Sequence, residues 1–91
     1  MKVSPTSVVH PGNVIVRAYV RHDAANRLME VAADSSGFFR SSMVELEGAE
    51  APFEHDFIFR DLPEGEYTVV AVLTGRDGKV RAYDSRPLLV F

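Results

Sequence analysis

The sequence contains no cysteine and no tryptophan. Without cysteine the chain can form neither a disulfide nor a cysteine-ligated zinc site, so apolar packing must supply its stability. No apolar run is long enough to cross a membrane as a helix, and none near Met1 has the length of a signal-peptide core. We therefore expect no membrane insertion, and either a cytoplasmic protein or a fragment of a longer one; the sequence does not assign a compartment.

Positive charge is also scarce. Ten Lys and Arg residues stand against thirteen Asp and Glu residues, which gives a formal net charge of -3. Nucleic-acid binding needs a basic surface to neutralise phosphates, so we do not expect it. The composition, with 46% hydrophobic and 25% charged residues, is that of a folded globular protein. A chain of 91 residues is expected to form one domain, 1–91.

Short segments of alternating apolar and polar residues dominate what is present. Residues 14–20 and 53–60 alternate with the period of two that is typical of a half-buried strand. Residues 67–74 are apolar on both faces in the middle, as in a central strand. Weaker patterns predict further strands at 3–9, 27–33, 38–46 and 79–90. Turn-forming Gly, Pro, Asp and Asn interrupt the chain six times, so we expect about seven strands in an antiparallel all-β sandwich.

A corner motif at 61–67 precedes the central strand. Pro63 and Gly65 turn the chain between two sheets, and Leu62 is placed to close the end of the core. The Tyr67 hydroxyl is expected to return to the backbone near the turn, which is the tyrosine corner of Greek-key sandwiches.

Further residues match a known family in their order along the chain. They are the strand Val14 to Val20, Phe57-Ile58-Phe59, the corner at 61–67, the Asp77-Gly78 turn, and Ser85 with Pro87. With these the chain resembles bacterial immunoglobulin-like and fibronectin type III-like domains, and, as a near relative, the transthyretin-like domain of carboxypeptidases. The resemblance implies an immunoglobulin-like Greek-key sandwich. It also implies an extracellular or periplasmic module, repeated in surface proteins or attached to an enzyme.

No combination of residues predicts catalysis or a bound cofactor. His10, His22 and His55 are not at metal-ligand spacing, and His55 lies on the apolar face of its strand, where we expect it to be partly buried. No serine stands in a Gly-x-Ser-x-Gly elbow. The chain is therefore expected not to be an enzyme and to hold neither cofactor nor metal.

Loop carboxylates leave one alternative open. Asp23, Asp34 and Asp77 lie in turns, where carboxylates and backbone carbonyls can form a weak calcium site. No EF-hand spacing is present, so the simpler interpretation is that these residues stabilise their turns.

Exposed aromatic and branched residues are the strongest functional signal. Neighbouring residues of a strand point in opposite directions, so one ring of the Phe38-Phe39 pair must face solvent. Such residues bury in protein interfaces or stack on sugars. The residues that we take as candidate partner contacts are Tyr19, Phe38, Val70, Val72 and Tyr83.

Three functional hypotheses follow from these observations. The first is a non-catalytic binding or spacer module that contacts a protein partner, a neighbouring domain or a second copy of itself. The second is a carbohydrate-binding accessory module, with the exposed rings as stacking platforms. The third is an accessory domain of an enzyme.

Overall fold

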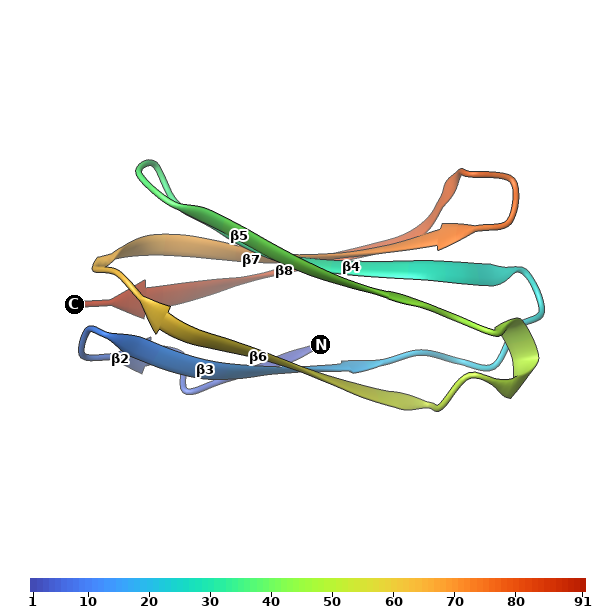
Figure 1. The fold of residues 1–91 in the computed structure, drawn as a ribbon, viewed down its shortest axis with the longest axis horizontal. Coiled ribbons are helices and arrows are strands. Elements are labelled where there is room, and N and C mark those ends of the chain that lie inside the picture. Colours follow the sequence, from blue (N-terminus) through green and yellow to red (C-terminus); the bar gives the residue numbers. More distant parts are fainter.

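The computed structural model describes residues 1–91, which form two sheets packed face to face (Figure 1). The three-stranded sheet has the order β1-β3-β6 and contains β1 (Lys2–Ser4), β3 (Gly12–Tyr19) and β6 (Glu54–Leu62). The five-stranded sheet has the order β2-β8-β7-β4-β5 and contains β2 (Ser7–Val8), β4 (Asn26–Asp34), β5 (Phe39–Glu45), β7 (Gly65–Gly75) and β8 (Val80–Val90). The predicted all-β class is confirmed.

Helical structure is limited to the 3-10 turn η1 (Gly48–Glu50). No helix is long and apolar enough to span a bilayer. All strand pairs are antiparallel except β2 with β8, which is parallel.

The N-terminal segment departs from the expected single strand at 3–9. β1 pairs with β3 in one sheet, whereas β2 pairs with β8 in the other. Pro5 lies between them and has no N–H to continue a ladder, which favours the change of sheet at this point. The chain therefore has eight strands instead of about seven.

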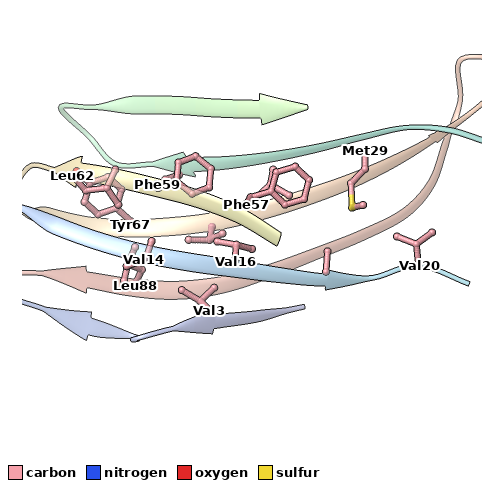
Figure 2. Packing of buried hydrophobic residues seen from close by; sticks show 14 of the residues in the cluster. Val3, Val14, Val16, Val20, Met29, Phe57, Phe59, Leu62, Tyr67 and Leu88 are labelled. Carbon is pink, nitrogen blue, oxygen red and sulfur yellow. The ribbon is translucent and has the colours of Figure 1, made fainter. Parts of the chain in front are cut away.

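The core lies between the sheets and is one cluster of 17 buried residues. On β3, Val14, Val16 and Ala18 point inward while the residues between them point outward, as the period-two pattern predicted. Phe59 of β6 is the largest fully buried side chain. Figure 2 shows Val14, Val16 and Phe59 facing side chains from the five-stranded sheet, among them Tyr67.

The predicted corner between β6 and β7 is confirmed. The Tyr67 hydroxyl donates a hydrogen bond to the Pro63 carbonyl oxygen at 2.7 Å, and Leu62 is fully buried. Asp61 has φ of 57°, and its N–H donates to Asn13 Oδ1 at 2.9 Å. This left-handed residue accompanies a bulge in the β3–β6 ladder, which bends β6 towards the other sheet.

Candidate functional site

A largely apolar groove lies between β3 of the three-stranded sheet and the β7–β8 hairpin of the five-stranded sheet. It encloses about 120 Å³. We call it the tyrosine groove and define it by Tyr19, Val72, Leu73, Ala82 and Tyr83. Tyr19 and Tyr83 are 49% and 64% exposed. The Tyr19 ring packs against Phe53 with centroids 5.7 Å apart, and Tyr83 faces outward beside Val72, so both residues border the mouth of the groove.

Small side chains explain why the groove is present. Ala18, Ala71 and Ala82 line it at positions where the facing sheets stand roughly 10 Å apart. An alanine methyl cannot fill that spacing. The β7–β8 ladder also shifts register between Leu73 and Thr74, which disturbs the hairpin beside the groove.

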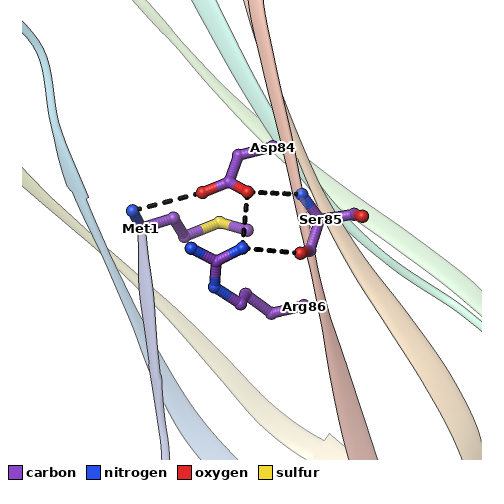
Figure 3. Close-up of polar contacts among 4 residues, drawn as sticks. All are labelled: Met1, Asp84, Ser85 and Arg86. Atoms are coloured by element: carbon purple, nitrogen blue, oxygen red, sulfur yellow. Dashed lines mark hydrogen bonds and ion pairs between the residues drawn. The ribbon is translucent and has the colours of Figure 1, made fainter.

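One rim of the groove is polar and carries a charged cluster (Figure 3). The amino group of Met1 lies 3.4 Å from Asp84 Oδ2. Asp84 Oδ1 accepts hydrogen bonds from the Ser85 backbone N–H at 2.9 Å and from Arg86 at 2.6 Å. These contacts hold the carboxylate at the rim and anchor the Met1 side chain in the groove wall.

A second hollow of about 330 Å³ continues the groove. The two hollows share four lining residues, including Tyr19 and Leu73. The second adds the cations Arg21 and Arg81. Arg81 makes a 2.8 Å ion pair with Asp23, whereas Arg21 makes none. The combined cleft therefore has an apolar floor and a positively charged end.

Three of the five candidate contact residues line the groove, and the other two do not. Tyr19, Val72 and Tyr83 line the tyrosine groove. Val70 does not line the groove and is half-buried on the outer face of the five-stranded sheet, the face to which Val72 and its cross-strand neighbour Tyr83 also belong. That these residues contact a partner stays a prediction.

Phe38 lies apart from the groove, near the corner. Its ring meets Tyr67 edge-on, with centroids 6.4 Å apart, and the Arg40 guanidinium lies 4.9 Å above it. Phe39 is 62% exposed. The expectation that one ring of this pair is solvent-facing is confirmed, and the ring concerned is Phe39.

The three histidines lie far from one another. His10 Nδ1 hydrogen-bonds to the Phe91 carbonyl oxygen at 3.0 Å, before β3 begins, and His22 follows the other end of that strand. The eight residues of β3 separate them by about 25 Å. His55 of β6 is half-buried, as expected, and its buried Nε2 has no hydrogen-bond partner.

The carboxylates considered for calcium are also dispersed. Asp23 is paired with Arg81, and Asp77 accepts the Lys79 backbone N–H at 3.0 Å. Asp34 ends β4 at the side away from Asp23. No three His, Asp or Glu side chains lie close enough to hold one metal ion.

An ion pair with two hydrogen bonds lies outside the groove, on the outer face of the three-stranded sheet. Arg17 donates two hydrogen bonds to Asp56, at 2.9 and 3.2 Å. These bonds lower the pKa of Asp56 below its ordinary value of 3.8 and raise the pKa of Arg17 further above its usual range. Both side chains are solvent-exposed, so the pair joins β3 to β6 and takes no part in the groove.

The sequence matches no known protein family, and no curated protein matches it. A solved structure, superoxide reductase (neelaredoxin) from Ignicoccus hospitalis, is similar to this chain with a TM-score of 0.71. The likeness covers 99% of this chain and 79% of the other, at 16% sequence identity. At that identity the likeness shows the fold.

This comparison contradicts the assignment to immunoglobulin-like and fibronectin type III-like domains. That assignment was based on the alternation of apolar and polar residues, on turn-forming residues and on the corner at 61–67. These describe strands and the crossing between two sheets, and such features are common to sandwiches with different functions. An immunoglobulin-like Greek key in particular is not confirmed.

The functional predictions are corrected by the same comparison. The chain was expected to be a non-catalytic binding, spacer or accessory module and not an enzyme, whereas the protein with the matching fold is an oxidoreductase. Redox chemistry needs no nucleophile or general acid in the sequence, because the electrons reside in a bound group and the protein supplies binding and orientation.

Proposed function

We propose that this chain is an oxidoreductase domain that acts on superoxide, with a planar organic redox group held in the tyrosine groove. The observation that carries the proposal is the fold shared with a superoxide reductase over 99% of this chain. The placement of the redox group rests on the donor atoms and the shape of the groove.

The reaction requires a one-electron carrier. One superoxide anion takes up one electron and two protons and leaves as hydrogen peroxide, and the electron comes from an external reductant through the carrier. The residues present do not fit a metal carrier, because the chain has no thiol and no group of three metal donors. Conjugated organic molecules of the flavin class are the other common one-electron carriers.

The groove and the hollow that continues it, of about 120 and 330 Å³, together offer the room that such a molecule needs. Flat conjugated rings bind against apolar floors and aromatic walls, with few polar groups to orient them. Here the floor is formed by alanines and Leu73, and the exposed residues Tyr19 and Tyr83 border the mouth. Arg21, at the charged end of the adjoining hollow, is placed to receive an anionic tail.

Flavin mononucleotide is the probe that tests this proposal. We expect its fluorescence to be quenched on titration with the chain, and Tyr19→Ala and Tyr83→Ala each to weaken binding by about tenfold or more. Phe39→Ala is the matched control, because it removes an exposed ring that is not in the groove. The flavin-loaded chain, supplied with a reductant, should consume superoxide faster than free flavin.

Two results would overturn the proposal. One is flavin binding that is absent or unaffected by both tyrosine substitutions. The other is superoxide consumption by the Fe²⁺-loaded chain without flavin, which would place the chemistry on a metal despite the dispersed donors.

The order in which the strands connect the two sheets supports a separate proposal. We infer a Greek-key connection, since β4–β5 and β7–β8 are hairpins of one sheet while β6 returns to pair with β3 in the other. The single buried cluster supports one domain over 1–91. A protein or carbohydrate partner stays a prediction.

A further inference from the structure

Strand β5 has one unpaired edge. It pairs with β4 along its whole length and with no strand on its other side. Just beyond its ends, the Leu46 N–H donates to the Arg27 carbonyl and the Ser35 N–H donates to the Phe38 carbonyl. These two pairs show that even-numbered residues turn their backbone groups towards β4.

The odd-numbered residues of β5 therefore turn their backbone groups outward, because the two sets alternate along an antiparallel ladder. The free N–H and C=O groups belong to Phe39, Ser41, Met43 and Glu45. Phe39 and Met43 are also 62% and 58% exposed, so apolar side chains accompany the free backbone groups.

The other edges of the two sheets are short or are interrupted by charges and proline. β2 covers only Leu89 and Val90 of β8, and the rest of that edge of β8 carries Arg81, Asp84, Arg86 and Pro87. β1 has three residues and β2 has two, which is too short to template another strand. β6 carries Glu54, Asp56, Arg60 and Asp61, and the bulge at Asp61 bends it. β5 has no proline and no bulge. Its only charges are Arg40, which donates to the Arg60 carbonyl oxygen of β6, and Glu45 at its end.

We propose that β5 pairs antiparallel with β5 of a second copy of this chain, about a twofold axis at Ser42. Centring the register on Ser42 uses all seven residues and places Ser41 opposite Met43, and Phe39 opposite Glu45, of the other copy. These are pairs of outward-turned backbone groups, so about eight hydrogen bonds form. The two five-stranded sheets become one continuous sheet.

The partner of the free β5 edge is a second copy of the chain, because the strand is complementary to itself. In this register no like charges face one another, since Arg40 lies opposite Val44 and the two Glu45 carboxylates lie at opposite ends. The pairing is isologous and closes at two copies. A single strand pair buries less surface than a standard stable interface, so the dimer is expected to depend on concentration.

Sedimentation equilibrium of the full chain tests the pairing directly. The mass should rise from one chain towards two between about 1 and 500 μM. Ser41→Lys combined with Met43→Lys places lysines opposite one another across the axis and should keep the chain monomeric. Ile58→Lys adds a charge to the β6 edge and should leave the dimer unchanged, with folding of each variant checked by circular dichroism.

A disulfide trap tests the register even if the lysine variant does not fold. The chain has no cysteine, so Ser42→Cys supplies a single thiol at the axis. Opposite residues in a non-hydrogen-bonded pair have Cα atoms about 4.5 Å apart, within disulfide range. Mild oxidation should convert most of this variant to a covalent dimer, at least about tenfold faster than Ile58→Cys.

A monomer up to about 500 μM, or cross-linking of Ser42→Cys no faster than Ile58→Cys, would overturn the proposal. Either result is independent of flavin binding, so this inference and the proposed redox function can fail separately.

Discussion

β5 and β6 are edge strands of opposite sheets, joined by the Arg40 contact to β6. They contribute differently to the molecule. β6 buries Phe57, Phe59 and Leu62 in the core and carries charges on its outer positions. None of the seven residues of β5 is buried, and Val44 only borders the core.

These two strands show that an edge strand can be attached to the rest of the fold in two ways. β6 is held by its side chains, and its charged positions discourage pairing with another chain. β5 is held chiefly by the backbone ladder with β4, so its side chains are free to serve association. Changes on β6 should therefore alter folding stability, whereas changes on β5 should alter the oligomeric state.

The largest effect is expected from truncation of the core residue of β6. Phe59→Ala removes a ring that is 1% exposed and should lower the free energy of unfolding by about 3–5 kcal/mol. Val44→Ala is the β5 counterpart and should cost about 1 kcal/mol, because Val44 is only half-buried. Urea denaturation followed by circular dichroism measures both. Equal losses would show that β5 carries as much of the core as β6.

A smaller effect is expected at the turns that lead from the two strands. Tyr67→Phe deletes the 2.7 Å bond to the Pro63 carbonyl after β6 and should cost about 1–2 kcal/mol. Ser35→Ala is the control before β5, since it deletes the longer, 3.2 Å bond from the Ser35 hydroxyl to the Phe38 carbonyl in the β4–β5 hairpin. Its cost should be below about 0.5 kcal/mol. A reversed order of denaturation midpoints would contradict this account of the corner.

The smallest effect concerns the surface charges of β6 and depends on pH. The pKa of Asp56 is lower in the folded chain than its ordinary value of 3.8, so the ion pair with Arg17 stabilises the fold above that value. The stabilisation is lost as pH falls through the lowered folded-state pKa. Asp56→Asn should therefore melt slightly below the parent chain at pH 7 and converge with it in acid.

Glu45→Gln is the matched control for Asp56→Asn on β5. The Glu45 carboxylate makes no ion pair. The difference in melting temperature between the Glu45→Gln variant and the parent chain should therefore not shrink in acid, as it is predicted to do for Asp56→Asn. A pH-independent difference for Asp56→Asn would assign its effect to something other than the ion pair.

Local patterns predicted the strands well and their partners poorly. Alternation located β3 and β6 to within two residues, because a half-buried strand must place apolar side chains on one face. The burial of Leu62 at the end of the core and the hydrogen bond from the Tyr67 hydroxyl were also predictable, since proline and glycine define the turn between these two residues. The division of 3–9 between two sheets was not, because a strand pattern does not say which neighbour it pairs with.

The candidate site was predicted only in part. Tyr19, Val72 and Tyr83 were recognised one by one as exposed positions, but nothing in the sequence places β3 beside the β7–β8 hairpin. Alanines at Ala18, Ala71 and Ala82 signal a cavity only once they are known to line the same space. Fold family was predicted wrongly, since the same local rules serve many sandwiches.

The amino-acid sequence by itself determined the all-β class, most strand positions, the corner at 61–67 and the absence of thiol chemistry, because each depends on residues close together in the chain. Only the tertiary structure decided which strands became edges, where the tyrosine groove lies and how far apart the histidines stand. Those properties depend on contacts between residues distant in sequence, which no local pattern specifies.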